Sequence, residues 1–176
     1  MSLATRLAAL NAARSLLALN LLMLLEAVAY VSSARQRLSD EDLEALLLRA
    51  RARNHSLGVT GVLLHHDGSF LQYFEGPAEG VRTVYDHIVR SPLHTGLIEL
   101  LHAPIPQRTF GAWEMGFTRA PRSAFLQLAN ASWQQQLHAQ RQAASRSDGL
   151  ALLLQFWRTN GGHEEVRPPL PGQPNA

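Results

Sequence analysis

Two apolar runs joined by an Asp-Gly pair limit the fold of this chain more than any other feature. The runs VTGVLLHH (59–66) and SFLQYFE (69–75) flank Asp67 and Gly68. An Asp-Gly pair readily adopts the positive φ angles that a two-residue hairpin turn requires. The sequence therefore predicts a β-hairpin, and it places the amide of Gln72 in the middle of an otherwise apolar strand.

Helical periodicity occurs on both sides of this hairpin. Leucines recur at helical spacing in LSDEDLEALLLRARARNHSLG (38–58), after a Ser39 and Asp42 pair that resembles a capping box. The segment PAEGVRTVYDHIVRS (77–91) predicts a second helix, and short apolar runs predict further strands at 26–32, 95–103 and 109–117. The order β-α-β-β-α-β-β indicates an α+β, ferredoxin-like sheet with two helices on one face.

The segments outside this core differ from it in composition. Residues 1–24 are rich in Leu and Ala and predict an N-terminal helix, although a signal peptide or a natural start at Met23 would also account for them. Polar residues interrupt this run, so no membrane span is expected. Residues 25–120 form the predicted domain, 121–160 a two-helix extension, and 161–176 a Pro-rich tail expected to be disordered.

Composition excludes several classes of function. The chain has no cysteine, which rules out disulfides and thiolate catalysis and is compatible with a cytoplasmic location. The net charge is only +2 and the arginines are scattered, so nucleic-acid binding is not expected. No metal site is expected either, because His65 and His66 are adjacent on a strand and point to opposite faces. No catalytic motif is recognisable, so we do not expect an enzyme.

Three polar residues interrupt apolar elements and are expected to meet in space. Tyr30 lies on the first strand, Asn54 ends the first helix, and Gln72 lies on the third strand. The first and third strands are neighbours in a ferredoxin-like sheet, which puts Tyr30 within hydrogen-bonding reach of Gln72. On the residues alone, two interpretations stay open: the pair only satisfies its own polar groups, or it borders a small cavity with Asn54.

Several sequence segments, which follow one another in a fixed order over residues 26–117, indicate the function more specifically. They read YVSSA, RARNHSLGVTGVLL, DGSFLQYFEG, VYDHIVRSPLH and RTFGAWEMGF. This series resembles the BLUF domain, a flavin-binding sensor of blue light. The resemblance implies that FAD, FMN or riboflavin lies between the two helices and against the sheet.

The resemblance also implies roles for individual residues. Tyr30 would be the light-driven electron and proton donor, Gln72 would bridge Tyr30 and the flavin, and Asn54 would hold the pyrimidine edge of the ring. His94, expected at the end of the second helix, would help to bind the flavin. Apolar lining would come from Val59, Phe70 and Leu71, and signalling from Trp113 and Met115 on the last strand.

The sequence departs from the family pattern at several flavin-contacting positions. Arg53 replaces an Asn, Ala50 replaces a Ser, and Ser91 and Leu93 replace the Asp and Arg of a D-P-R-H segment. Arg51 or Arg53 is therefore expected to supply the missing charge from the first helix. The alternative is a flavin-free or light-insensitive interaction module on the same scaffold.

The resemblance to short BLUF proteins bears on partners as well. It implies self-assembly into a homo-oligomer and signalling to a downstream protein partner. The N-terminal helix and the helix that contains Trp157 are the candidate contact surfaces.

Overall fold

The computed structural model describes residues 24–133 and 148–160. Its elements, in chain order, are β1 (Leu25–Ala34), α2 (Asp40–Ser56), β2 (Thr60–His66), β3 (Ser69–Pro77), α3 (Ala78–Arg90), β4 (His94–Ile105), β5 (Gly116–Arg119), α4 (Arg122–Ala129) and α5 (Gly149–Asn160). The first seven follow the predicted order of strands and helices.

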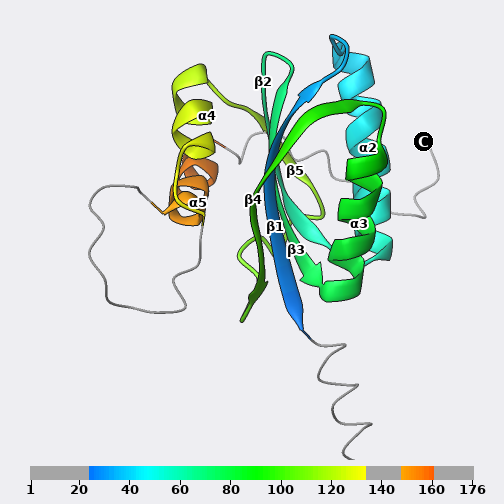
Figure 1. Ribbon diagram of the computed structural model, residues 1–176, viewed down its shortest axis with the longest axis vertical. Helices are drawn as coiled ribbons and strands as arrows, with labels where there is room; N and C mark the ends of the chain where they lie inside the picture. Colours follow the sequence, from blue (N-terminus) through cyan, green and yellow to red (C-terminus); the bar gives the residue numbers. More distant parts are fainter. Residues whose placement is uncertain (1–23, 134–147, 161–176) are drawn as a thin grey trace, which may run out of the picture.

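The strands form one five-stranded sheet in the order β4-β1-β3-β2-β5. β1 pairs antiparallel with both β3 and β4, β2 pairs antiparallel with β3, and β5 runs parallel to β2. Helices α2 and α3 cover one face of the sheet, and α4 and α5 cover the other (Figure 1). The ferredoxin-like fold predicted from the sequence is confirmed.

Local sequence signals account for the boundaries of these elements. Asp67 and Gly68 have φ angles of 42° and 75°, as the turn between β2 and β3 requires. The Ser39 hydroxyl accepts from the Asp42 amide while the Asp42 carboxylate accepts from the Ser39 amide, which completes the capping box of α2. Gly58 follows α2 with a φ of 62°, a left-handed conformation that glycine adopts without strain.

Side-chain alternation along β3 divides the core into two. Leu71 and Tyr73 pack with α4 and α5, whereas Phe70 and Phe74 pack beneath α2 and α3. Gln72 shares the α2/α3 face with the two phenylalanines. A polar amide therefore sits between apolar layers, which requires it to find partners within the protein.

The predicted bounds of the last strand are largely wrong. The prediction covered 109–117, but β5 begins only at Gly116. The preceding backbone is held by other contacts: the Phe110 amide donates to the Glu75 carboxylate, and the Trp113 amide donates to the Phe110 carbonyl in a turn. These contacts leave no regular ladder, so Trp113 and Met115 lie on a loop before the strand.

The first helix of the C-terminal extension is shorter than its helical pattern predicts. The pattern extends over 123–144, but α4 ends at Ala129. The side chains of Asn130 and Trp133 donate to the carbonyls of Leu126 and Leu128, which satisfies the end of the helix. The remainder of this prediction, with the N-terminal helix and the Pro-rich tail, falls outside the described residues.

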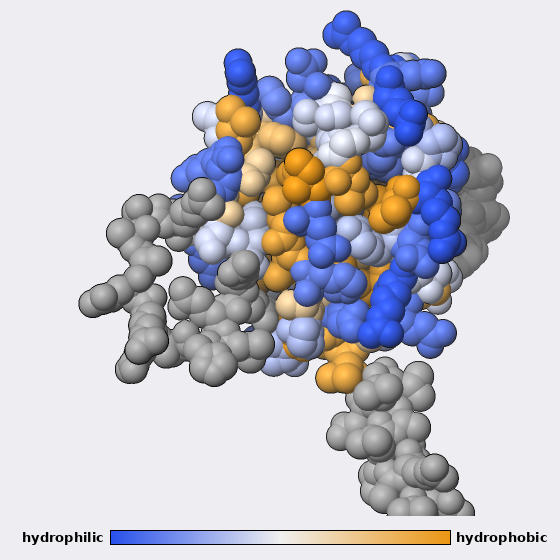
Figure 2. Space-filling view, in the orientation of Figure 1, coloured by the Kyte–Doolittle hydropathy of each residue, from blue (hydrophilic) through white to orange (hydrophobic). Residues whose placement is uncertain are grey.

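The surface over edge strand β4 mixes apolar and charged residues (Figure 2). Ile98 on this strand is 60% exposed. Within the described ranges, no helix combines the length and the hydropathy needed to cross a bilayer.

Candidate functional site

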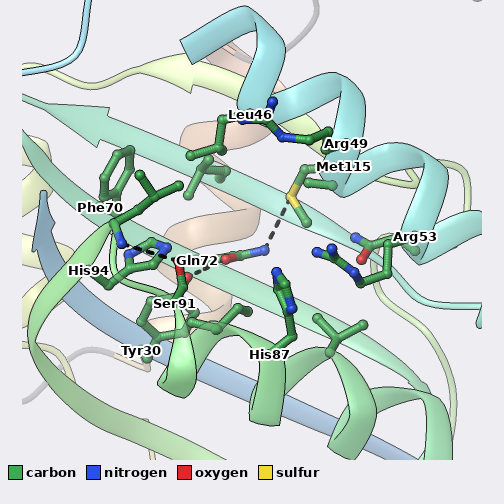
Figure 3. A pocket seen from close by; sticks show the side chains of 16 residues that line it. Tyr30, Leu46, Arg49, Arg53, Phe70, Gln72, His87, Ser91, His94 and Met115 are labelled. Atoms are coloured by element: carbon green, nitrogen blue, oxygen red, sulfur yellow. Dashed lines mark hydrogen bonds between the residues drawn. The ribbon is translucent and has the colours of Figure 1, made fainter. Parts of the chain in front are cut away.

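A cavity of about 90 Å³ lies between α2, α3 and the sheet and opens to solvent. Its lining combines buried polar groups from the sheet with apolar and basic side chains from the helices (Figure 3). The lining residues are Tyr30, Leu46, Arg49, Ala50, Arg53, Asn54, Leu63, Phe70, Gln72, Val84, His87, Ile88, Ser91, Leu93, His94 and Met115.

Tyr30 and Gln72 face each other directly across β1 and β3. The Tyr30 hydroxyl donates to Gln72 Oε1 at 2.5 Å, and both side chains are buried. Burial raises the pKa of Tyr30, and Tyr85 nearby raises it further. The phenol is therefore neutral at ordinary pH and keeps its proton on the hydrogen bond to Gln72.

The other end of the Gln72 amide points toward Met115. Its Nε2 lies 3.4 Å from Met115 Sδ (Figure 3). A thioether is a weak acceptor, so this end of the amide is held less firmly than the Tyr30 end. Gln72 thus joins the sheet to the loop before β5 through one strong and one weak contact.

Helix α2 holds the same loop from the other side. Asn54 Nδ2 donates to the Glu114 carbonyl at 2.7 Å, and Arg51 Nε donates to the Met115 carbonyl at 3.0 Å. His55 also pairs with the Glu114 carboxylate. Residues of α2 therefore fix the backbone that carries Met115 into the cavity, a role that the sequence pattern did not reveal.

His94 lies against Tyr30 and Phe70 with both ring pairs edge-on, at 6.2 and 5.5 Å. Its Nδ1 is 3.0 Å from the Ser32 hydroxyl. Burial lowers the pKa of His94, and His87 lowers it further, so the imidazole is neutral at neutral pH. Its predicted place at the end of a helix is wrong, because α3 ends at Arg90 and His94 begins β4.

The cavity lining includes some of the predicted site residues and omits others. It includes Tyr30, Arg53, Asn54, Phe70, Gln72, His94 and Met115. It omits Arg51, Val59, Leu71 and Trp113, for reasons that differ between them.

The predicted lining role of Leu71 is wrong, because Leu71 neighbours Gln72 along β3 and so points to the α4/α5 face. Val59 is buried with Phe74 and Val81 and does not reach the cavity. Arg51 contacts the Met115 carbonyl instead of the cavity.

Trp113 lies on the opposite face of the sheet from Gln72. Its ring packs edge-on against Trp157 of α5, with 5.3 Å between centroids. Its carbonyl accepts from the Gly61 amide at 2.6 Å. Met115 and Trp113 are two residues apart on one loop. Met115 points to the cavity, whereas Trp113 points to helix α5.

Two basic lining residues escaped sequence reasoning. Arg49 precedes Arg53 by four residues on α2, and His87 lies on α3 between the buried residues Val84 and Ile88. The four-residue spacing is the one signal that would have placed Arg49 beside Arg53.

The chemical character of the lining side chains fits a flavin. Apolar side chains would contact the faces of a flat ring, while Gln72 and Asn54 offer amides to a polar edge. The cavity is smaller than the roughly 300–1,000 Å³ typical of ligand pockets. Admission of a three-ring ligand therefore requires the cavity to widen, and its lining includes the exposed side chains of Arg49 and Leu93. Among residues 24–133 and 148–160, no cluster of His, Asp and Glu is arranged to hold a metal ion.

Comparisons with known proteins agree with this geometry. A family model described as BLUF, sensors of blue-light using FAD, matches residues 25–116. The photoactivated adenylate cyclase subunit beta of Euglena longa is 36% identical over 88 residues, which are 50% of this chain and 10% of that protein. The blue light- and temperature-regulated antirepressor BluF of Escherichia coli (strain K12) is 35% identical over 88 residues, 50% of this chain and 22% of that protein.

A solved structure of a BLUF protein also resembles this chain. The dark-state structure of the BLUF protein BlrB superimposes with a TM-score of 0.53 at 28% identity, over 56% of this chain and 74% of that one. The chain thus spans a minor part of the length of the curated relatives named above. Every residue that lines the cavity falls inside the family match. The chain therefore belongs to the BLUF family of blue-light sensors that use FAD.

Proposed function

We propose that this chain is a blue-light photoreceptor whose switch is the hydrogen-bonded pair Tyr30 and Gln72. The observation that carries the proposal is the buried contact from the Tyr30 hydroxyl to Gln72 Oε1, beside the weaker contact from Gln72 Nε2 to Met115. The cofactor is FAD, the flavin that the family description names, or FMN. Tyr30, Asn54, Phe70, Gln72 and His94 form its binding site.

The arrangement suits a phenol that gives up an electron and a proton together. A flavin held by Asn54, Gln72 and His94 would supply the acceptor for this electron when it absorbs blue light. Loss of an electron makes the Tyr30 hydroxyl strongly acidic, and its proton already lies on the hydrogen bond to Gln72 Oε1. The proton therefore moves to the Gln72 amide without any change of partner, while burial excludes water from the transfer.

The amide of Gln72 then rearranges, by rotation or by tautomerism. Either change replaces a donor with an acceptor, or the reverse, at a fixed position in the cavity. The contact from Gln72 Nε2 to Met115 Sδ is the weakest bond of the group, and it is the one that breaks. The loop before β5 is the two-state element that such a change biases.

We propose that the output leaves through Trp113 and helix α5. Met115 and Trp113 share the loop, and Trp113 packs on Trp157, which supports a route from the cavity to the opposite face. The receiver would be a downstream protein or a second copy of the chain. We place this signalling in the cytoplasm.

One observation favours the alternative of a flavin-free interaction module. Leu93 lines the cavity where the family pattern has an arginine, so one charged contact to the cofactor is lost. Without a flavin, Tyr30 and Gln72 would simply satisfy each other inside the core.

Absorbance spectroscopy of the purified full-length chain separates the two functions. We expect a flavin spectrum that shifts reversibly to the red under blue light. In Gln72→Leu the shift should vanish while flavin stays bound, because leucine fills similar space without an amide. A protein without flavin would eliminate the photoreceptor, and an unchanged shift in Gln72→Leu would remove Gln72 from the switch.

A further inference from the structure

Three basic side chains from two helices line the cavity. Arg49 and Arg53 lie one helical turn apart on α2, and His87 projects from α3 toward Arg53 (Figure 3). Arg49 and His87 are exposed and Arg53 is half-buried, whereas Tyr30 and Gln72 at the sheet are buried. The cavity therefore has neutral groups on its buried side and basic groups on its exposed side.

No acidic residue balances this charge within the lining. In the part of the chain that the structure describes, neither Arg49 nor Arg53 pairs with a carboxylate, whereas Arg82, Arg90 and Arg119 each do. Burial lowers the pKa of His87, and the neighbouring Arg53 lowers it further. Arg49 and Arg53 thus place two positive charges one helical turn apart, and a bound anion would relieve their repulsion and favour the charged form of His87.

Gln72 and Asn54, which offer amides to a ring edge, are buried, whereas Arg49 and His87 lie on the exposed side of the cavity. A flavin that presents its ring to those amides carries its ribityl chain away from them, and in FMN and FAD that chain ends in phosphate. Guanidinium groups bind phosphate through paired, charge-assisted hydrogen bonds. The helix α2 thereby supplies cations that position 93, a leucine here, does not.

We infer that Arg49, Arg53 and His87 form a phosphate subsite that makes this chain select phosphorylated flavins over riboflavin. The inference rests on the proposed function, since it needs the ring to occupy the cavity. It also excludes Arg51 from the subsite, because Arg51 is engaged with the Met115 carbonyl.

The test compares affinities of riboflavin, FMN and FAD for the full-length chain freed of its own flavin, measured by quenching of flavin fluorescence. We expect FMN and FAD to bind at least about ten-fold more tightly than riboflavin at low salt, and the preference to shrink as salt rises. Arg53→Gln and Arg49→Gln should each reduce the FMN-to-riboflavin preference by up to about five-fold, the upper range for one exposed ion pair.

The preference, not either affinity alone, is the readout, because misfolding or a damaged ring site weakens both ligands together. Arg90→Gln is the matched control, since Arg90 lies on α3, pairs with Asp86 and does not line the cavity. Its preference should equal that of the wild-type chain. Equal affinities for riboflavin and FMN, or preferences unaltered by Arg49→Gln and Arg53→Gln, would overturn the subsite alone. Failure of all three flavins to bind would overturn the proposed function as well.

Discussion

Glu75 is a fully buried carboxylate that holds the loop before β5 to the sheet. Its Oε2 accepts from the Tyr73 hydroxyl at 2.9 Å, and its Oε1 accepts from the Phe110 amide at 2.5 Å. Burial raises the pKa of Tyr73, and Glu75 raises it further, so the phenol is neutral and donates. Glu75 is also three residues from Gln72 on β3, but its side chain points to the α4/α5 face.

These contacts predict how much the free energy of unfolding falls when the carboxylate is removed. Glu75→Ala leaves two buried donors without an acceptor, at about 1–3 kcal/mol each, so the free energy of unfolding should fall by about 2–6 kcal/mol. Glu75→Gln keeps an oxygen for the Phe110 amide and offers its NH₂ to the Tyr73 oxygen. We expect that variant to lose less than about 1.5 kcal/mol.

Urea denaturation followed by circular dichroism measures both values. The loop that Glu75 secures also carries Met115, so Glu75→Ala should in addition alter the light-induced shift, whereas Glu75→Gln should preserve it. Similar stability losses in the two variants would refute the hydrogen-bond argument, because the glutamine keeps an acceptor for the Phe110 amide and a donor to the Tyr73 oxygen, whereas the alanine keeps neither. A loss below about 1 kcal/mol in Glu75→Ala would refute it equally.

Two further predictions address the switch and its output. Tyr30→Phe removes the proton donor but keeps the packing, so the normal photocycle should disappear while flavin stays bound; transient absorption that matches the wild-type photocycle would show that another donor suffices. A Cβ at Gly116 would come within 2.4 Å of the Trp157 ring, so Gly116→Ala should displace α5 and lower the free energy of unfolding by about 1–3 kcal/mol, with altered tryptophan fluorescence. Gly111→Ala is the control, because its Cβ would meet nothing closer than 3.5 Å, and equal effects of the two substitutions would contradict the Trp157 contact.

Local signals in the sequence were sufficient for most of the fold. The Asp67-Gly68 turn and the Ser39 capping box act within a few residues, so they hold whatever packs around them. The pairing of Tyr30 with Gln72 followed from the element order, because a ferredoxin-like sheet places the first and third strands side by side.

The same reasoning failed where long-range contacts replace regular structure. Apolar residues at 109–117 suggested a strand, but the Phe110 amide bonds to a carboxylate and the Glu114 carbonyl accepts from Asn54. Such side-chain partners lie far away in the sequence and leave no periodic pattern. The α4 helix likewise ends early because Trp133 folds back onto the Leu128 carbonyl.

The sequence by itself determined the order of strands and helices, the tight turn, and the presence of Tyr30, Asn54 and Gln72 within apolar elements. Only the tertiary structure decided that Met115 faces the cavity while Trp113 faces α5, and that Arg49 and His87 line one cavity with Arg53. The reason is physical: hydrophobic periodicity and turn chemistry are set by neighbours along the chain. The direction of a loop side chain is set instead by hydrogen bonds and packing against residues far away in the sequence.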